Sequence, residues 1–364
     1  MRARSLRSPA PKFRQRCRVS FVNPPTRPII VVDPHPRPVE LIFDSPTRAR
    51  LEALGEVIWH DGSPASPEFL DRHLPRATYL IGQSDLPRVR LERAPHLRAV
   101  FNVEGNFLPN IDYAECQRRG LSVLSTAPVF AQPVAEMALG LAIAAARRIP
   151  ETDAALRSGQ ESLYGMADNF DSVLLQRRTL GIIGFGNLGQ ALLPLLRPFG
   201  GEILAHDPWV DPAVLTSAGL IAAPLSEIFA RSTVVFILSA VTTENAGKLG
   251  AAEFGRMPPG AIVVLVSRAG VVNFDALLDA AASGRIRAAI DVWPEEPIPA
   301  GHRARSTPNT ILQAHRAGNI PEIWPEMGRR VTDDIARFEQ GLPPQHCQLA
   351  RWETVAKLRS KPVS

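Results

Sequence analysis

Three residues that could carry chemistry, Arg268, Asp291 and His315, each follow the end of a short apolar run within three residues. A guanidinium can hold a planar carboxylate through two parallel hydrogen bonds. A histidine can take up and return the proton of an alcohol. Glu296 lies five residues after Asp291, and a carboxylate beside His315 would fix its tautomer and favour the imidazolium. The set predicts a site that binds a 2-hydroxy or 2-oxo acid through Arg268.

A glycine-rich segment, TLGIIGFGNLG over residues 179–189, combines a strand-like run with Gly184-x-Gly186-x-x-Gly189. The first glycine permits a tight turn, the second lets the backbone approach a pyrophosphate, and the third allows close packing of the following helix. The N-terminus of that helix offers free N–H groups to the anion. Asp207 lies 18 residues after Gly189, where a carboxylate would bind a ribose 2′-OH and repel a 2′-phosphate. The pattern predicts NAD in preference to NADP.

From Thr179 onward, strand-like runs alternate with helical candidates, which favours an α/β fold with a Rossmann-type doubly wound parallel sheet. Ligands bind beyond the carboxyl ends of the strands in such a sheet. We therefore expect the residues named above at the same edge as the glycine loop. The predicted strands are Leu180–Ile183, Ile203–Ala205, Val234–Leu238, Ile262–Val266, Ala288–Ile290 and Ile311–Leu312. The predicted helices are Leu188–Leu196, Ala213–Ala218, Ala251–Arg256 and Phe274–Ala282.

The N-terminal part of the chain predicts a second, smaller α/β unit. Short apolar runs separated by proline-rich turns over residues 29–126 are typical of its strands. Val134–Ala146 is predicted to be a long buried helix, and Pro321–Gln340 a final helix. Residues 150–178 are more polar and lack a clear period, so they are interpreted as an arm or loop. No element is predicted for the last twenty residues.

The net charge of +5 over 364 residues comes from the N-terminus. Residues 1–32 carry eight Lys or Arg and no acidic side chain, which leaves 33 basic and 36 acidic residues elsewhere. The basic arm, residues 1–28, is expected to be disordered because it has little apolar surface to bury. A targeting peptide and a nucleic-acid-binding tail are the alternatives. No nucleic-acid partner is expected, since no binding motif accompanies the arm.

The remaining composition, 45% hydrophobic and 21% charged, is typical of a globular protein. The three cysteines, Cys17, Cys116 and Cys347, are odd in number and far apart, and no CxxC occurs. This pattern excludes a disulfide framework and a cysteine-rich zinc site, and it favours a reducing cytoplasmic location. No metal is predicted. The longest apolar stretch, Met137–Ala146, is shorter than the roughly 18 residues of a membrane span, so no membrane association is expected.

The sequence resembles the D-isomer-specific 2-hydroxyacid dehydrogenases over residues 95–342. The likeness includes the glycine loop GFGNLG with Asp207. The other segments that carry it are NID at 110–112, PVAEMALGLAIAAARR at 133–148, VTTEN at 241–245, SRAGVVNFDALLDAAASGRI at 267–286, DVWPEEP at 291–297 and AHRAG at 314–318.

The resemblance implies an NAD-dependent dehydrogenase that transfers a hydride between NAD(H) and a 2-hydroxy or 2-oxo acid. By this likeness Arg268 binds the substrate carboxylate, His315 is the acid–base residue and Glu296 is its partner. Glu104 and Gly105 would lie beside the substrate. The implied cofactor-binding residues are Gly184, Phe185, Gly186, Asn187, Leu188, Gly189, Asp207, Ala240 and Asp291.

The resemblance also implies a domain arrangement. A Rossmann-type NAD-binding domain, residues 127–315, would be inserted in a smaller flavodoxin-like substrate domain. That domain would consist of residues 29–126 and a returning helix within residues 316–344, followed by a tail over 345–364. The active site would lie in the cleft between the domains. Residues 133–178 resemble a dimerisation helix and arm, so we expect a homodimer.

The chain departs from the family pattern around the implied substrate. Phe107 stands where the second glycine of a Gly-x-Gly loop is usual, Ile320 replaces a small Ser or Thr, and Arg316 adds a cation. These changes leave the identity of the 2-hydroxy acid open. An alternative function is an NAD(H)-sensing, corepressor-like binding protein on the same scaffold, which only the basic arm supports.

Overall fold

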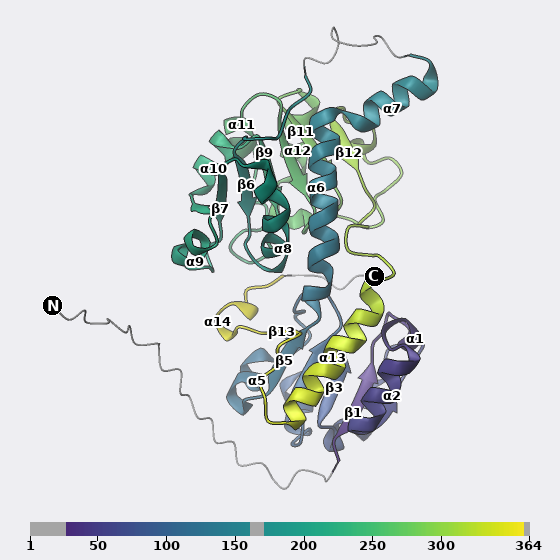
Figure 1. Ribbon diagram of the computed structural model, residues 1–364. Coiled ribbons are helices and arrows are strands. Elements are labelled where there is room, and N and C mark those ends of the chain that lie inside the picture. Colours follow the sequence, from purple (N-terminus) through teal and green to yellow (C-terminus); the bar gives the residue numbers. More distant parts are fainter. Residues whose placement is uncertain (1–26, 161–170, 360–364) are drawn as a thin grey trace, which may run out of the picture.

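The computed structural model describes residues 27–160 and 171–359. The predicted basic arm lies outside these residues except for its last two positions, and residues 161–170 of the predicted dimerisation arm also lie outside them. The described residues form two α/β domains, each built on its own sheet (Figure 1). The predicted α/β fold class is confirmed.

The lower domain in Figure 1, which corresponds to the predicted substrate domain and keeps that name below, has a six-stranded sheet in the order β13-β5-β4-β3-β1-β2. All neighbouring strands are parallel except β13, which runs antiparallel to β5. The order of its first five strands is that of flavodoxin. The strands are β1 Ile29–Asp33, β2 Glu56–Trp59, β3 Tyr79–Gly82, β4 Ala99–Asn102, β5 Ser122–Ser125 and β13 Gln348–Leu349. The helices between the first five strands are α1 Val39–Ile42, α2 Ser45–Leu54, α3 Pro67–His73, α4 Arg88–Glu92 and α5 Tyr113–Arg119.

The late helix α13 (Ile323–Glu339) also belongs to this domain, where it packs beside α1 and α2. Its buried face, which includes Met327 and Val331, joins the core formed by the early strands. The approach to α1 is close, because a Cβ on Gly328 would lie 2.2 Å from the carbonyl oxygen of Ile42. Only glycine permits this contact, through which an early and a late segment of the chain share one core.

The other domain, which corresponds to the predicted NAD-binding domain and is called the nucleotide-binding domain below, has a seven-stranded parallel sheet in the order β12-β11-β10-β9-β6-β7-β8. The direction of winding reverses between β6 and β9, which is the switch point where dinucleotides bind in a Rossmann fold. The strands are β6 Leu180–Ile183, β7 Ile203–His206, β8 Ile221–Ala222, β9 Val234–Ile237, β10 Ala261–Leu265, β11 Ile286–Ile290 and β12 Thr310–Leu312. The helices are α8 Asn187–Leu196, α9 Pro212–Ser217, α10 Leu225–Arg231, α11 Ala251–Arg256 and α12 Phe274–Ala282.

The long helix α6 (Ala131–Arg147) connects the domains and packs against α8 and the strands β10 and β11. Together with the turn before it, Ala127–Arg147 is long and apolar enough to cross a bilayer by length and composition alone. Buried alanines along α6 place one face in the core of the nucleotide-binding domain, as in a core helix of a globular protein. The next helix, α7 (Ile149–Ser158), projects from the body and has no buried residue (Figure 1).

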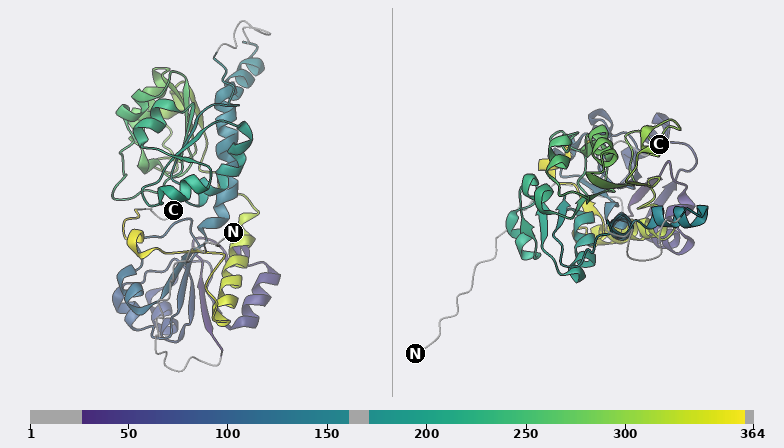
Figure 2. Two further views of the ribbon diagram at one scale, coloured as in Figure 1. Left: turned by 60° about the vertical axis from the view of Figure 1, so that its left-hand side comes forward. Right: turned by 90° about the horizontal axis from the view of Figure 1, so that it is seen from above.

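The last described residues form structure where the sequence predicts a tail. After β13 comes α14 (Trp352–Val355), whose Val355 is buried in the substrate-domain core. The chain then reaches the nucleotide-binding domain, where Leu358 forms an antiparallel β-bridge with Thr242. Figure 2 shows α14 beside the gap between the domains. We call residues 348–359 the C-terminal strap.

Candidate active site

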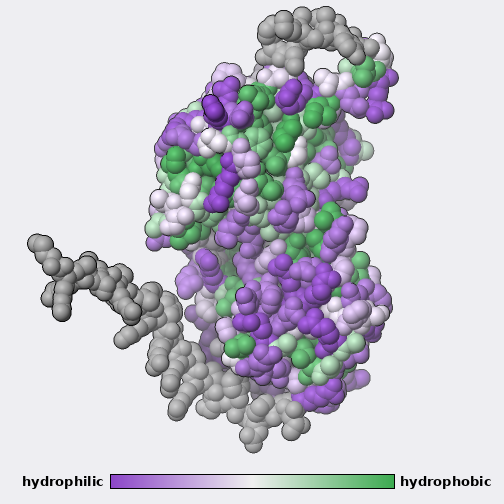
Figure 3. Space-filling view, in the orientation of Figure 1, coloured by the Kyte–Doolittle hydropathy of each residue, from purple (hydrophilic) through white to green (hydrophobic). Residues whose placement is uncertain are grey.

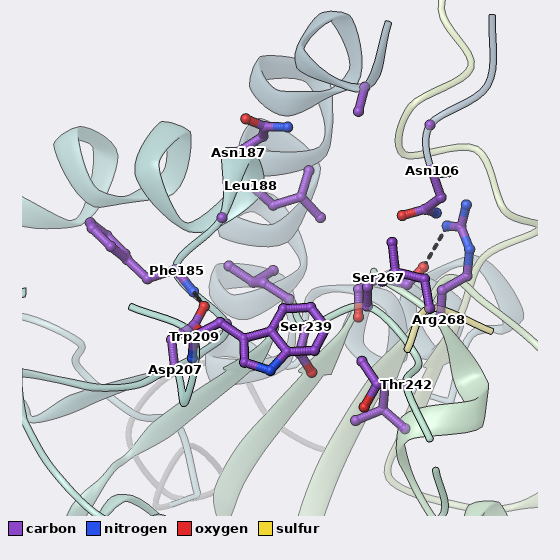
Figure 4. Close-up of a pocket in the computed structure, with 18 of the residues that line it drawn as sticks. Asn106, Phe185, Asn187, Leu188, Asp207, Trp209, Ser239, Thr242, Ser267 and Arg268 are labelled. Atoms are coloured by element: carbon purple, nitrogen blue, oxygen red, sulfur yellow. Dashed lines mark hydrogen bonds between the residues drawn. The ribbon is translucent and has the colours of Figure 1, made fainter. Parts of the chain in front are cut away.

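A cavity of 920 Å³ lies between the two domains and is lined by residues of both. Figure 4 shows Asp207 and Trp209 on one side of the view and Arg268 with Asn106 on the other. Of the predicted site residues, Gly189 and Glu296 do not line the cavity. Those that do are Glu104, Gly105, Gly184, Phe185, Gly186, Asn187, Leu188, Asp207, Ala240, Arg268, Asp291 and His315.

The glycine loop joins β6 to α8 in the conformation that its sequence requires. Gly184 has a φ of +95°, and a Cβ there would lie 2.6 Å from the backbone nitrogen of Ser239. A Cβ on Gly189 would lie 2.6 Å from the carbonyl oxygen of Gly184, so this glycine permits close packing of α8. Gly186 faces open space, with no atom within 4 Å of where its Cβ would be. The loop leaves room for a phosphate at the start of α8.

Asp207 follows β7 and binds the glycine loop directly. Its Oδ2 accepts a hydrogen bond from the Phe185 N–H at 2.8 Å, and its Oδ1 accepts one from the Trp209 N–H at 2.9 Å. These bonds hold the carboxylate at the edge of the cavity, where Figure 4 shows the Trp209 indole beside it. A carboxylate has about four lone-pair sites, so acceptor capacity remains for ribose hydroxyls.

A dinucleotide fits the donors and acceptors on this side of the cavity. The hydroxyl of Ser239 is buried and has no hydrogen-bond partner among the described residues, although Ser239 lines the cavity. A buried hydroxyl without a partner is costly unless a ligand or water satisfies it. The open cradle at Gly186, the orphaned hydroxyl and the carboxylate of Asp207 together suit a pyrophosphate and a ribose.

His315 and Glu296 form a hydrogen-bonded pair at the other side of the cavity. His315 Nδ1 lies 2.6 Å from Glu296 Oε2, and the Trp293 N–H donates to Glu296 Oε1 at 2.9 Å. His315 has a φ of +51°, which is unusual for a residue with a Cβ. Its backbone N–H donates to the carbonyl oxygen of Asp291. Because Nδ1 faces the carboxylate, Nε2 is the ring nitrogen left for a substrate.

Asp291 supports the loop that carries His315. Its carboxylate is fully buried and accepts hydrogen bonds from the N–H groups of Arg316 and Ala317 at 2.9 and 3.1 Å. The pKa of Asp291 lies above its usual value, because the effect of burial is larger than the opposite effect of these two backbone donors. The structure thus places Asp291 on the cavity wall and also gives it a positioning task that the sequence did not indicate.

Arg268 projects toward the substrate-domain loop that follows β4. Its Nη1 donates to the Ser267 carbonyl oxygen at 2.7 Å (Figure 4), and its Nη2 donates to the side-chain oxygen of Asn106 at 2.9 Å. Burial lowers the pKa of the guanidinium, and the nearby carboxylates of Glu104 and Glu296 raise it. A guanidinium remains charged in proteins, so Arg268 presents a fixed cation to the cavity.

The structure adds cavity residues that sequence reasoning missed. Arg37 follows β1 and lines the cavity beside Glu104, and the rule that ligands meet strand ends could have found it. Ser239 follows β9 in the same way. The strap contributes a third group for which the sequence carries no signal, and it includes Gln348, Arg351, Thr354 and Leu358.

Hydrogen bonds and an ion pair join the strap to two parts of the nucleotide-binding domain, the start of α8 and the loop that follows β9. The side chain of Asn187, the first residue of α8, donates to Gln348 Oε1 at 2.7 Å. The Thr243 N–H donates to the carbonyl oxygen of Lys357, and Lys357 Nζ lies 2.6 Å from Glu244 Oε1. The strap therefore closes one wall of the cavity.

Comparison with known proteins shows which family the chain resembles. Residues 139–317 match the family model described as the D-isomer specific 2-hydroxyacid dehydrogenase, NAD binding domain. A D-3-phosphoglycerate dehydrogenase of Mycobacterium leprae is 33% identical over 266 residues, which cover 71% of this chain and 49% of that protein. The chain thus spans about half the length of that relative. A glyoxylate reductase of Korarchaeum cryptofilum is 30% identical over 79% of this chain and 87% of that protein.

A solved structure shares the whole architecture. The crystal structure of a phosphoglycerate oxidoreductase from Rhizobium etli superposes with a TM-score of 0.81 at 40% sequence identity, and the match covers 90% of this chain and 100% of that one. The two sheets, the glycine loop at the switch point and these relatives agree. The chain belongs to the D-isomer specific 2-hydroxyacid dehydrogenase family, which confirms the predicted family, the Rossmann-type domain and NAD as the class of cofactor.

Proposed function

We propose that this chain is an oxidoreductase that interconverts a 2-hydroxy acid and its 2-oxo acid with NAD(H). The observation that carries the proposal is the pairing of His315 with Glu296 at 2.6 Å on the same cavity as Arg268 and the glycine loop. Reduction consumes one NADH and one proton for each 2-oxo acid. When bound, NADH supplies the hydride that adds to C2 of the substrate.

The protein groups bind the acid and manage its proton. Arg268 pairs with the substrate carboxylate and stabilises the negative charge that develops on the reacting oxygen. His315 Nε2 gives its proton to that oxygen during reduction and removes it during oxidation. Glu296 holds Nδ1, which orients the ring and stabilises the imidazolium.

A panel of 2-oxo acids with NADH and NADPH, followed by absorbance, tests the proposal. We expect NADH-dependent turnover of at least one of glyoxylate, pyruvate, hydroxypyruvate or phenylpyruvate. His315→Ala is expected to abolish most turnover and to leave NADH affinity close to that of the wild type. Equal turnover by the wild type and this variant would remove His315 from the proposed role.

The sensor alternative predicts a different result from the same panel. A nucleotide-sensing protein would bind NADH tightly and turn over none of these acids. The relatives reported above carry enzyme names, which favours the dehydrogenase.

We also propose that the protein is a homodimer. The helix α7 exposes Ile149 (50%) and Leu156 (61%) and buries no residue within the described chain. Figure 3 shows hydrophobic residues gathered on the nucleotide-binding half of this face, whereas the lower half is mostly hydrophilic. Sedimentation of the wild type and of Leu156→Asp tests this. A dimer in both would contradict a role for α7, and a monomeric wild type would contradict the dimer itself.

A cytoplasmic location is part of the same proposal. Cys116 and Cys347 are buried and free, as expected in a reducing compartment. Fractionation of cells that express the tagged chain measures the location directly. Recovery in a membrane or organelle fraction would overturn it.

A further inference from the structure

A second charged pair on the cavity wall has no task in the proposed reaction. Arg37 Nη1 donates to Glu104 Oε1 at 2.5 Å, and the two side chains are only 11% and 5% exposed. Arg37 comes from the loop after β1, and Glu104 comes from the loop after β4. Both line the cavity that also holds Arg268 and His315. The pair therefore faces the cavity from the substrate-domain side.

Neighbouring groups fix the orientation of this pair. Gln83 Nε2 donates to Glu104 Oε1 at 3.3 Å, and the guanidinium carbon of Arg37 lies 5.1 Å from the ring centroid of Trp324. The Glu104 N–H donates to Asn102 Oδ1 at 2.8 Å. The two hydrogen bonds that the Glu104 carboxylate accepts, from Arg37 and Gln83, both use Oε1, and no described residue donates to Oε2. One carboxylate oxygen therefore remains free to accept a hydrogen bond.

The charges on the cavity wall decide which substrates the pair suits. Arg268 is balanced by the carboxylate of the substrate, and Glu296, which does not line the cavity, is balanced by the imidazolium of His315. Arg37 pairs with Glu104, whose carboxylate also acts on the nearby Arg268. The buried carboxylate of Asp291 adds a further negative charge to the wall. A second anion on the substrate would meet the carboxylate of Glu104 and leave an uncompensated negative charge in a buried site, which is costly.

An uncharged hydroxyl satisfies the pair without adding charge. It can donate its hydrogen to Glu104 Oε2 and accept a hydrogen bond from the guanidinium of Arg37. A substrate without such a polar group would leave both charged groups without a partner from the substrate.

On the basis of the proposed dehydrogenase function, we propose that the Arg37–Glu104 pair selects the substrate. It favours 2-oxo and 2-hydroxy acids that carry an uncharged hydroxyl besides the carboxylate. It disfavours acids that carry a second anion, such as a phosphate.

The test compares NADH-dependent kcat/KM of the full chain for pyruvate, hydroxypyruvate and 3-phosphohydroxypyruvate. We expect the wild type to prefer hydroxypyruvate over each of the others by about 10- to 100-fold, the range of one hydrogen bond to a charged group. Glu104→Gln keeps the shape and removes the negative charge, so the ratio of phosphorylated to hydroxylated substrate should rise at least about tenfold.

Asp333→Asn is the matched control, because it removes the carboxylate of an Arg–carboxylate pair with Arg50 in the same domain and does not line the cavity. It should leave the substrate ratios unchanged. NADH binding and the unfolding temperature of each variant show whether it is folded. If Glu104→Gln does not fold, the double variant Arg37→Gln/Glu104→Gln replaces it. The double variant should lose the preference for hydroxypyruvate over pyruvate.

The outcomes separate this inference from the proposed function. A wild type that prefers the phosphorylated acid, or substrate ratios that Glu104→Gln does not change, overturns the selection role while turnover of pyruvate sustains the dehydrogenase. A wild type that turns over none of the three acids, and neither glyoxylate nor phenylpyruvate, overturns both.

Discussion

Glu296→Gln is the sharpest test of how the His315 pair works, because the structure predicts which way the new amide points. The Trp293 N–H donates to Glu296 Oε1 and needs an oxygen acceptor. The amide oxygen of the variant must therefore remain at that position, and the NH₂ group must face His315 Nδ1. An NH₂ group can only donate, so His315 would accept at Nδ1 and carry its single proton on Nε2.

This arrangement disfavours the protonation state of His315 that each direction of the reaction requires. In oxidation Nε2 must be free to take the alcohol proton, and in reduction the ring must carry protons on both nitrogens. The lost contact is a charge-assisted hydrogen bond at 2.6 Å between side chains that are 26% and 32% exposed. Such a bond contributes about 1.5–3 kcal/mol. Because the pair is partly exposed, we expect its loss to raise the activation free energy by about 2 kcal/mol. That corresponds to a fall in kcat of about 30-fold.

The assay is steady-state turnover in both directions with a preferred 2-oxo acid and its alcohol, together with NADH titration by fluorescence. KM for NADH and the NADH dissociation constant are expected to stay close to wild type, because Glu296 does not line the cavity. Glu295→Gln, at an exposed neighbouring carboxylate, is the matched control and should behave as the wild type. A Glu296→Gln enzyme with kcat within twofold of wild type in both directions would refute the reasoning.

Three further predictions concern the cofactor, the strap and the thiols. Asp207→Ala should shift the ratio of kcat/KM for NADH to that for NADPH toward NADPH by at least about tenfold, and an unchanged ratio would contradict its placement at the ribose. Deletion of residues 348–364 should raise the NADH dissociation constant about tenfold. Lys357→Gln, which removes only an exposed ion pair, should change it less than twofold. Burial raises the pKa of Cys116 to about 12 and that of Cys347 well above its usual range, so the reactive thiolates are scarce at pH 8. Iodoacetamide should alkylate both cysteines only after unfolding, as detected by mass spectrometry. Rapid alkylation of either one in the native protein would contradict the burial of its thiol.

The elements of the nucleotide-binding domain could be predicted because each local pattern agrees with the tertiary fold. The expected helix Phe274–Ala282 is α12, and Asn273 caps it by accepting a hydrogen bond from the Ala276 N–H. The expected strand Leu180–Ile183 is β6, fully buried between β7 and β9. Buried parallel strands are continuous apolar runs, which makes them easy to identify.

Helix α7 shows where apolar periodicity fails as a signal. The polar composition of residues 150–178 predicts an arm or loop, yet Ile149–Ser158 is a helix. It buries no side chain, so no apolar face marks it. The sequence signal for this helix lies at its ends instead. Pro150 stands in the first turn, and Gly159 ends the helix with a φ of +65°.

The candidate site was predictable wherever a side chain follows a strand in the sheet that was identified. Arg268, Asp291 and His315 follow β10, β11 and β12 in this way. The same rule applies to Arg37 after β1, but three nearby prolines made that segment look like a turn. The contact between Arg37 and Glu104 joins residues 67 positions apart, and no pattern within either segment indicates it.

The strap is the part of the site that sequence patterns could not supply. Its strand has two residues and its helix has four, which is too short for either a two-residue or a 3.6-residue period to emerge. Its structure comes from contacts with distant residues, namely β5, Asn187 and Thr242. Because these partners belong to both domains, relative movement of the domains must strain or break at least one of these contacts. Opening of the cleft and loosening of the cofactor wall are therefore coupled, which is why the deletion should weaken NADH binding although the glycine loop remains intact.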